Sequence, residues 1–296
     1  MAGRVAVTGG SGKLGRACVR HLVEHGWSVV VLDAVAPVEP LCPFVRVDLG
    51  DYGQTVEALT GVDDRHQGVD AVVHLAAIPA PGLTTNAATF RNNVPATYNV
   101  FAAARQAGIR NVVWASSETV LGLPFQTPPP YLPADEEYPP SPESTYSLGK
   151  VLEEEMAAQF CRWDPELKMI GLRFSNVMEV GDYAAYFPSF ESDIGLRRWN
   201  LWSYIDARDG AQAIRKALEY TATGKEIFLI ASPDTVMSRP TRELIAEAYP
   251  DLPLRREISG NESLFSIDKA RRLLGFAPEY SWRDEVDAAK RSAAAS

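Results

Sequence analysis

A tyrosine and a lysine stand four residues apart in the segment "ESTYSLGK", as Tyr146 and Lys150. Two side chains at this spacing project from the same face of a helix, about one turn apart. A phenol with a pKa of about 10 is mostly protonated at neutral pH, and a neighbouring ammonium lowers that pKa. The spacing therefore allows the phenol and the ammonium to act as a pair. Taken alone, the same spacing is also common on solvated helix faces.

A glycine-rich turn near the start of the chain indicates what this pair would act with. The segment "TGGSGKLG" places glycines at positions 9, 12 and 15, between a Val-rich run and a helical pattern. Glycine permits a tight turn and a close approach of the backbone to a pyrophosphate, which then lies at the positive end of the helix. By itself the pattern is weak evidence, because glycine-rich turns before helices are common.

Asp33 makes a dinucleotide site the better interpretation. It ends the second apolar run of the chain, as expected of a carboxylate that accepts hydrogen bonds from both adenosine ribose hydroxyls. The same carboxylate would repel a 2′-phosphate, which favours NAD over NADP. Lys13 argues the other way, because a cation near the phosphates would help NADP, so NADP stays open as the alternative.

Short apolar runs alternate with helical patterns along the first half of the chain. Strands that are buried on both faces of a parallel sheet have such runs, mostly without polar alternation. The predicted strands are residues 4–9, 28–33, 44–49, 70–77, 111–117 and 168–174. Two helical patterns between them end at Gly26 and Gly108, and Pro95 is expected to bend the second. This order predicts an α/β fold with helices on both faces of a parallel sheet.

The regular alternation fades after residue 175. Only a helix over residues 204–220 and a strand over residues 226–232 are clear in that part of the chain. The remainder is interpreted as a smaller and partly irregular lobe.

Several motifs occur in the order and approximate spacing of the extended short-chain dehydrogenase/reductases, the NAD-dependent epimerase/dehydratase family. They are "TGGSGKLG", "VDLGD", "HLAA", "NNVPAT", "WASSETVLG", "YSLGK" and "LRFSNV", and "SIDKARRLLGFAP" is similar to the family's ending. The resemblance covers nearly the whole chain. It implies a Rossmann-type doubly wound sheet in residues 1–174, to which residues 203–220 return. Residues 175–202 and 221–296 would form a small substrate-binding lobe.

The resemblance also implies roles for individual residues. Catalysis would fall to Ser117, Tyr146 and Lys150, with Ser117 polarising the substrate oxygen. The expected cofactor is NAD, held by Gly9, Gly12, Lys13, Leu14, Gly15, Asp33, Asp48, Leu49, Leu75, Ala76, Ala77, Asn93, Ser116, Tyr146 and Lys150. Expected substrate contacts are Ser117, Glu118, Thr119 and Asn176. A turn carboxylate is the alternative for Asp48, and a helix-surface amide is the alternative for Asn93.

Two further substrate contacts are predicted from chemistry alone. Arg197 and Arg198 begin the segment "RRWNLW". A guanidinium binds a carboxylate through two parallel hydrogen bonds, and indole rings pack against sugar rings. The segment thus predicts an anchor for a sugar acid, although core tryptophans with solvated arginines are the simpler alternative.

Two departures from the family pattern narrow the expected reaction. Dehydratases carry a Thr-Asp-Glu triplet where this chain has Ser117, Glu118 and Thr119, which disfavours dehydration. Epimerases have a long lobe after the "LRFSNV" segment, whereas only the interval from Phe174 to Tyr204 is present here, which resembles the family's uronate and aldose dehydrogenases. We therefore expect hydride transfer between NAD and a small polyhydroxylated or carbonyl substrate, a sugar or sugar acid. The alternatives are a sugar-nucleotide epimerase and a non-catalytic dinucleotide sensor.

Composition limits the other partners. Of the 296 residues, 46% are hydrophobic and 23% are charged, and the net charge of −9 comes without a basic cluster. This argues against nucleic acid and anionic membranes as partners. Three cysteines and four histidines show no disulfide or metal spacing, so we expect reduced thiols and no metal.

Two further expectations concern location and assembly. No apolar run suits a signal peptide or a membrane span, which predicts a cytoplasmic protein. Two long helical segments, about residues 86–107 and 144–163, correspond to the helices through which members of the family pair. A homodimer is therefore expected, with a plain helix surface as the alternative.

Overall fold

Seven parallel strands form the central sheet of the computed structural model, which describes residues 3–287. Their order is β3-β2-β1-β4-β5-β6-β9, and every neighbouring pair is parallel. This is the Rossmann-type order with one strand added beyond β6. The strands are β1 (Arg4–Thr8), β2 (Ser28–Asp33), β3 (Phe44–Arg46), β4 (Ala71–His74), β5 (Asn111–Ser117), β6 (Lys168–Phe174) and β9 (Gly224–Ile230).

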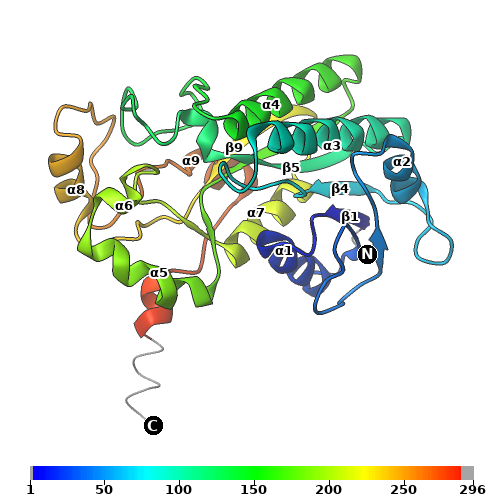
Figure 1. Ribbon diagram of the computed structural model, residues 1–296, viewed down its shortest axis with the longest axis horizontal. Helices are drawn as coiled ribbons and strands as arrows, with labels where there is room; N and C mark the ends of the chain where they lie inside the picture. Colours follow the sequence, from blue (N-terminus) through cyan, green and yellow to red (C-terminus); the bar gives the residue numbers. More distant parts are fainter. Residues whose placement is uncertain (1–2, 288–296) are drawn as a thin grey trace, which may run out of the picture.

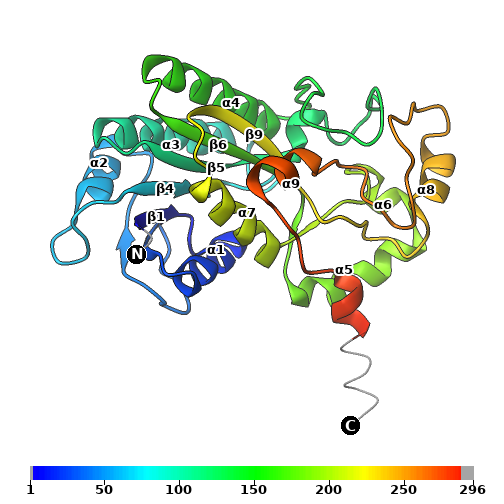
Figure 2. The same cartoon turned by 180° about the vertical axis from the view of Figure 1, so that it is seen from behind.

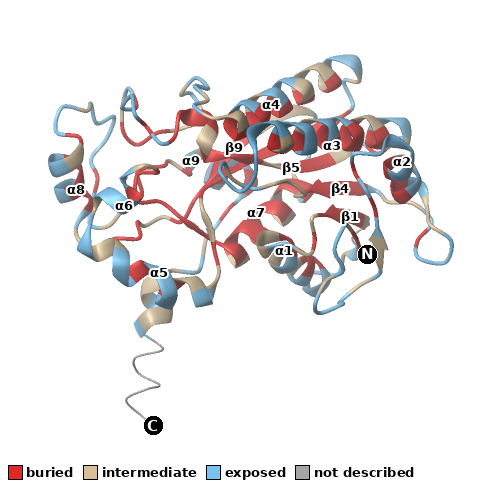
Figure 3. Ribbon diagram, in the orientation of Figure 1, coloured by how far each residue is buried: buried red, intermediate tan, exposed pale blue. Residues whose placement is uncertain are grey.

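Helices cover both faces of the sheet (Figure 1). One face carries α2 (Tyr52–Thr60), α3 (Asn86–Gln106) and α4 (Thr145–Trp163), and the other carries α1 (Lys13–Glu24) and α7 (Ala207–Glu219). The strands between them are buried (Figure 3), which explains why their apolar runs lack polar alternation.

The sheet divides the apolar core into two parts. On β1, Val5 and Val7 point into the part under α1 and α7, whereas Ala6 points toward α3 and α4. Successive side chains of a strand face opposite sides, so each central strand contributes to both parts. The α/β fold predicted from the sequence is confirmed.

The predicted elements of the first half agree with the structure, apart from some ends. β3 and β4 are shorter than predicted, because the chain leaves the sheet after Arg46 and His74 to form the loops of its carboxyl edge. Helices α1 and α3 end within two residues of Gly26 and Gly108, as expected. Helix α3 runs unbroken through Pro95.

Strand β9 corrects the predicted division of the chain. It pairs with β6 over seven positions, from Lys168↔Gly224 to Phe174↔Ile230, and so extends the sheet. Helix α9 (Asp268–Leu274) packs against it. The sequence placed all of residues 221–296 in the lobe because the alternation of strands and helices is no longer regular there.

The lobe lies at the carboxyl edge of the sheet, since the chain enters it directly from β6 and β9 (Figures 1 and 2). Buried aromatic side chains, among them Trp202 and Tyr204, form its core. Trp202 donates its indole N–H to the carbonyl of Ile194 at 2.8 Å. Its elements are β7 (Val177–Met178), α5 (Val180–Ser192), α6 (Gly195–Arg198), β8 (Ile205–Asp206) and α8 (Thr241–Ala248). None of the helices within residues 3–287 has the length and apolar character to cross a membrane.

Candidate active site

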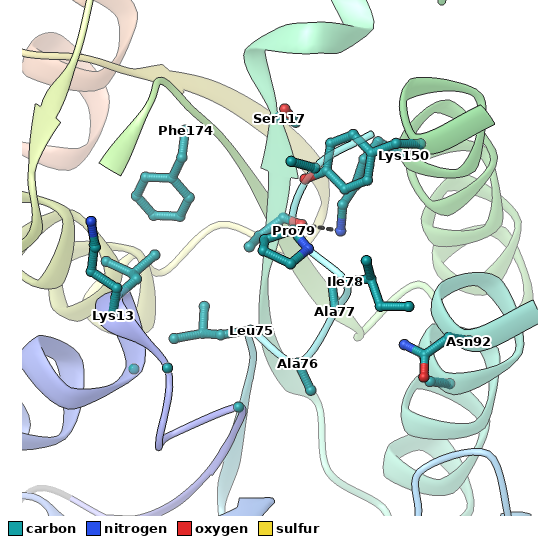
Figure 4. A pocket seen from close by; sticks show the side chains of 18 of the residues that line it. Lys13, Leu75, Ala76, Ala77, Ile78, Pro79, Asn92, Ser117, Lys150 and Phe174 are labelled. Atoms are coloured by element: carbon teal, nitrogen blue, oxygen red, sulfur yellow. Dashed lines mark hydrogen bonds between the residues drawn. The ribbon is translucent and has the colours of Figure 1, made fainter. Parts of the chain in front are cut away.

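A large cavity opens at the carboxyl edge of the sheet, between the glycine-rich turn, the strand ends and the lobe. Its volume is about 1610 Å³, whereas most small-molecule sites have roughly 300 to 1,000 Å³. It therefore has room for a dinucleotide together with a second molecule. Lys13 and Phe174 lie on one side of it, and Lys150 and Asn92 lie on the other (Figure 4). Open α/β sheets bind their ligands at this edge.

Most of the predicted site residues line this cavity. Ser117, Tyr146 and Lys150 are among them, together with Gly9, Gly12, Lys13, Leu14, Gly15, Asp33, Asp48, Leu49, Leu75, Ala76, Ala77, Ser116, Glu118, Thr119 and Asn176. Three predicted residues lie outside the lining: Asn93, Arg197 and Arg198.

The glycine-rich turn is packed so closely that side chains would not fit. A Cβ on Gly15 would lie 2.1 Å from the carbonyl oxygen of Gly9, and one on Gly9 would lie 2.6 Å from the backbone nitrogen of Ala76. Gly9 also has a φ of +69°, which favours glycine. The turn leads directly into α1, so backbone N–H groups and the positive helix end face the cavity together. This cradle fits a pyrophosphate.

Two backbone N–H groups fix the Asp33 carboxylate at the end of β2. Ser11 donates to Oδ2 at 3.0 Å and Val35 donates to Oδ1 at 3.1 Å. The carboxylate is thereby held at the cavity wall, beside the glycine-rich turn. A ribose with two free hydroxyl groups is the kind of ligand that such an acceptor suits.

Lys150 is buried beneath Tyr146 on the face of α4 that packs against β5. Its Nζ donates to the carbonyl oxygen of Ala115 at 2.8 Å and to Oε2 of Glu153 at 2.9 Å. The same Nζ lies 5.8 Å from the centre of the Tyr146 ring. The structure therefore brings the phenol and the ammonium together, and adds a carboxylate that the sequence analysis did not consider.

Ser117 completes the predicted trio at the end of β5. Its hydroxyl lies close enough to the Tyr146 phenol to lower the pKa of that phenol. Thr119 donates its hydroxyl to Ser117 Oγ at 2.9 Å, and its backbone N–H donates to the same oxygen at 3.2 Å. Because Oγ of Ser117 accepts both bonds, its own proton remains available for a partner in the cavity. The three side chains can bind and protonate one substrate oxygen.

Burial and charge act on Tyr146 in opposite directions. Burial is the largest effect and raises the pKa of the Tyr146 phenol, whereas the ammonium of Lys150 lowers it. The carboxylate of Glu153 adds to the rise, and the net direction is upward. Burial is the largest effect on Lys150 and lowers its pKa, but Glu153, Tyr146 and Glu154 together outweigh burial, so the net pKa of Lys150 is raised. The sequence predicted only the lowering by Lys150.

Glu118 is an almost fully buried carboxyl group in the cavity wall, next to Ser117. It begins the short 3₁₀ turn η1 (Glu118–Leu121), with 2% of its surface exposed. Asn200 donates its Nδ2 to Oε1 of Glu118 at 3.2 Å. Burial raises the pKa of Glu118 to about 7, although Asn200 and Arg197 act in the opposite direction. Glu118 therefore changes charge near neutral pH.

The two predicted arginine anchors do not reach the cavity. Arg197 is 5% exposed and donates Nη2 to the carbonyl of Ser203 at 2.7 Å, while its guanidinium lies 5.1 Å from the Trp199 ring. Arg198 is exposed and lies over the ring of Tyr249. Neither guanidinium is available to a substrate in the cavity, so the predicted carboxylate anchor is not supported. Trp199, from the same segment, does line the cavity.

Asn93 supports the cavity wall from behind instead of lining it. Its Oδ1 accepts the N–H of Ile78 at 2.8 Å, and its Nδ2 donates to the carbonyl of Ile78 at 3.0 Å. It thus holds the loop that follows β4. Asp48 accepts the N–H of Gly50 at 2.8 Å and also lines the cavity, so the two interpretations of this residue are both compatible with its position.

The sequence analysis missed part of the cavity wall. The loop after β4 contributes Ile78 and Pro79, and the end of β6 contributes Phe174 and Ser175. The rule that ligands bind at the carboxyl ends of parallel strands would have included both segments. Glu153 stands one helical turn after Lys150, and that spacing was a signal for it. Within residues 3–287, no group of three or more His, Cys, Asp or Glu side chains could hold a metal ion.

Comparisons with known proteins agree with this geometry. Residues 5–231 match the family described as "NAD dependent epimerase/dehydratase family". UDP-glucose 4-epimerase 2 of Oryza sativa subsp. japonica is 32% identical over 218 residues, which are 68% of this chain and 50% of the relative. The chain thus spans about half the length of that epimerase. L-arabinose 1-dehydrogenase (NAD(P)(+)) of Haloferax volcanii is 28% identical over 225 residues, or 73% of this chain and 82% of the relative.

A solved structure extends the likeness over the whole fold. A crystal structure of UDP-galactose 4-epimerase superposes with a TM-score of 0.68 at 27% sequence identity. The superposition covers 97% of this chain and 99% of that chain. The lobe of this protein therefore has a counterpart in a chain that carries an epimerase's name.

The raised pKa of Glu118 predicts a pH-dependent stability. A carboxyl group whose pKa rises on folding stabilises the folded protein below its unfolded pKa of about 4.3, and this contribution is lost as the pH rises through the folded pKa. We expect the free energy of unfolding of the wild type to fall relative to that of Glu118→Gln by roughly 2 to 3 kcal/mol between pH 5 and pH 8. Urea unfolding at several pH values measures this. Glu24→Gln, at an exposed position of α1, controls for the loss of one negative charge; parallel curves for wild type and Glu118→Gln would contradict the prediction.

Proposed function

The chain belongs to the NAD-dependent epimerase/dehydratase family, and from this premise we propose that it is an oxidoreductase that transfers a hydride between NAD and a small polyhydroxylated or carbonyl substrate. When bound, NAD accepts or supplies the hydride. The proposal is supported by the cradle of the glycine-rich turn, by the fixed carboxylate of Asp33 and by the trio of Ser117, Tyr146 and Lys150 in one cavity.

The residues around the sheet's edge would hold the cofactor. The N–H groups of the glycine-rich turn and the start of α1 would bind its pyrophosphate, and Asp33 would bind the adenosine ribose. Asp48 and Leu49 would contact the adenine end, and Lys150 the nicotinamide ribose. In this proposal residues 1–174 serve the cofactor, together with β9 and α7, and the lobe serves the substrate.

The trio in the cavity would handle the substrate oxygen. Ser117 would donate a hydrogen bond to it, and Tyr146 would give it a proton during reduction or take one during oxidation. Lys150 would keep the Tyr146 phenol oriented and able to ionise. Support comes from the contact between Ser117 and Tyr146 and from the ammonium beneath the ring.

The proposal of a small substrate depends on which cationic side chains in the cavity wall are already bound to other groups of the protein. Within the described lining, Lys13, Arg46 and Lys150 are the cationic side chains. Lys13 pairs with Asp182, and Lys150 pairs with Glu153. Arg46 extends from β3, where its Nη1 donates to the carbonyl of Ala34 at 3.0 Å, at the cofactor end. A sugar nucleotide would bring a second diphosphate, and phosphates are typically bound by free Arg or Lys side chains or by N–H groups.

The substrate end of the cavity suits hydroxyl groups better than a carboxylate. Ser175, Asn176 and Thr119 line it with neutral polar groups, and Trp199 adds an aromatic ring. Arg197, the predicted carboxylate anchor, lies in the core of the lobe. Neutral free sugars and polyols therefore come before uronates in the order of candidates.

A sugar-nucleotide epimerase is the second candidate, and the comparisons favour it. The matched UDP-galactose 4-epimerase structure aligns with nearly the whole chain, so the short interval between β6 and β8 does not separate the two functions. The same cofactor and the same catalytic trio would serve in both. A dehydrogenase would release an oxidised product and NADH, whereas an epimerase would release an epimerised sugar nucleotide and keep its cofactor as NAD⁺.

A substrate screen decides between these candidates. We expect net NADH formation when the protein is given NAD⁺ with a neutral sugar or polyol, and no interconversion of UDP-glucose and UDP-galactose. Tyr146→Phe should lower kcat at least about 100-fold, because it removes the group that exchanges the proton. Tyr186→Phe, an exposed tyrosine on α5, is the matched control. Epimerised UDP-sugar without net NADH would replace the proposal by the second candidate, and no turnover of any kind would favour a non-catalytic dinucleotide sensor.

The position of Asp33 predicts the choice of cofactor. NADH should bind more tightly than NADPH, because a 2′-phosphate would meet the fixed carboxylate. Asp33→Ala should narrow this difference by reducing NADH affinity and admitting NADPH. Fluorescence titration of the reduced cofactors measures both affinities without a substrate. Equal affinities in the wild type would refute the assignment.

We propose that the protein is a homodimer that pairs through α3 and α4. Both helices expose large apolar side chains, namely Phe90, Tyr98, Leu148, Leu152 and Trp163. Light scattering should give twice the mass of one chain, and Leu152→Glu should give a monomer because a buried charge at such an interface is costly. Leu273→Glu, on the exposed side of α9, should remain dimeric. A wild type that is monomeric at micromolar concentration would rule the dimer out.

A further inference from the structure

A second buried charge stands next to Lys150. Glu153 follows it by one helical turn on α4, has 0% of its surface exposed, and pairs with an ammonium that is itself 4% exposed. The ion pair is 2.9 Å long, and the carbonyl of Ala115 is the other acceptor of the ammonium. Within residues 3–287 the other carboxylate oxygen, Oε1 of Glu153, has no hydrogen-bond partner, so Lys150 is the group that compensates this buried charge. The surroundings of Glu153 therefore determine what it does to Lys150.

A chain of hydrogen bonds runs through the core beside Glu153. Thr97 of α3 lies close enough to Glu153 to lower the pKa of that carboxyl group, and Oγ1 of Thr97 lies 3.0 Å from Nε2 of His74. Nδ1 of His74 lies 2.7 Å from Oγ1 of Thr8. Thr8 Oγ1 also accepts the N–H groups of Leu75 and Ala76, at 3.2 and 3.3 Å. The three side chains of this chain and Glu153 are all buried.

The protons of this chain can be assigned from one end to the other. Because Oγ1 of Thr8 accepts two backbone N–H groups, its own proton goes to Nδ1 of His74. The imidazole then carries its proton on Nε2 and donates it to Thr97, whose own hydroxyl proton remains available to turn toward Glu153. Burial lowers the pKa of His74 to about 3, with a further contribution from Lys150, so the ring is neutral as this assignment requires. Oε2 of Glu153 accepts from Lys150, and Oε1 of Glu153 has no hydrogen-bond partner among the described residues.

The next residue shows that Glu153 has a separate role. Glu154 is also buried, but it receives two hydrogen bonds from Arg173, at 2.9 and 2.8 Å, and one from Ser116 at 2.6 Å. Its charge is compensated by a guanidinium, and it joins α4 to β5 and β6. Glu153 has only the ammonium of Lys150 to compensate it. Of these two adjacent acids, Glu154 therefore supports the packing of α4 against the sheet, whereas Glu153 acts on Lys150.

We propose that Glu153 is a positioning residue for the Tyr146–Lys150 pair: its carboxylate fixes the ammonium beneath the ring and, by offsetting that positive charge, makes the phenol harder to ionise. The role of the phenol as proton donor rests on the proposed function. A protonated phenol can give its proton to a carbonyl oxygen, whereas a phenolate takes one from a hydroxyl group. Glu153 therefore favours reduction near neutral pH and moves oxidation to higher pH.

The charges around the pair support this direction. Glu153 is faced by Lys150 and Glu154 on α4, by Thr97 on α3, and through Thr97 by His74 on β4. Burial raises the pKa of Glu153, and Lys150 opposes that rise. Tyr146 is faced by Lys150, Glu153, Ser117 and Glu118. Burial, Glu153 and Glu118 raise its pKa, while Lys150 and Ser117 lower it, so removing the charge of Glu153 leaves the ammonium less opposed.

The ionisation of Tyr146 can be measured directly by tyrosinate absorbance during a pH titration of the full chain. The protein has 11 tyrosines, so each titration is repeated in the Tyr146→Phe background and the difference isolates Tyr146. In Glu153→Gln, which keeps the shape and removes the charge, we expect the Tyr146 midpoint to fall by about one pH unit. Glu155→Gln is the matched control, because Glu155 is exposed on the same helix, and its midpoint should equal that of the wild type.

Glu153→Met provides a second variant without the charge, in case the amide disturbs the hydrogen-bond chain. A lower Tyr146 midpoint in either folded variant supports the proposal, and an unchanged midpoint in a folded variant overturns it. Loss of folding in both variants would assign Glu153 to stability alone and also overturn it. The titration needs neither cofactor nor turnover, so a failed substrate screen counts against the proposed function and leaves this result intact. Once a substrate is known, the pH profile of kcat should shift by the same amount.

Discussion

The buried ammonium of Lys150 is the charge around which the site is arranged. A lone cation in a protein interior costs several kcal/mol, so it must be surrounded by acceptors that are themselves held in place. The carbonyl of Ala115 provides one acceptor at the end of β5, and Glu153 provides another on α4. The paired Glu154 and Arg173 hold α4 against the sheet, which keeps these acceptors at hydrogen-bonding distance. Tyr146 meets the ammonium because the same helix carries both.

The lobe contributes a second set of ion pairs on the opposite side of the cavity. Lys13 of the glycine-rich turn pairs with Asp182, and Arg16 of α1 pairs with Glu179. Such partly exposed pairs contribute only about 0 to 1 kcal/mol each, but they set the position of α5 relative to the start of α1. They also change the meaning of Lys13. With its charge directed to Asp182, Lys13 no longer argues for a 2′-phosphate, and in the proposed function Asp33 is the residue that would distinguish NAD from NADP.

The sequence predicted what depends on local pattern and missed what depends on distant contacts. Glycines at fixed offsets, Asp33 at a strand end and Tyr146 four residues before Lys150 are local features, and the structure brings them to one cavity. Arg197 looked like a substrate anchor because its type suits a carboxylate, but its direction is set by packing in the lobe. Strand β9 was recognised, yet its partner β6 lies more than 50 residues earlier, and no local pattern reports that pairing.

The ion pairs of the cations in the cavity wall also affect whether an oxidised product would leave the site. Epimerisation at a carbinol carbon requires the oxidised sugar to return its other face to the hydride, so it must stay bound while it turns. A diphosphate held by free cations is an anchor that permits this movement. Of the three cations in the described cavity wall, Lys13 pairs with Asp182, Lys150 pairs with Glu153, and Arg46 donates to the carbonyl of Ala34. A sugar held only through hydroxyl groups, at Ser117 and the neutral side chains near Trp199, would have little to retain it after oxidation. Both candidate enzymes would oxidise a carbinol carbon with NAD, and only a dehydrogenase would then release the oxidised product.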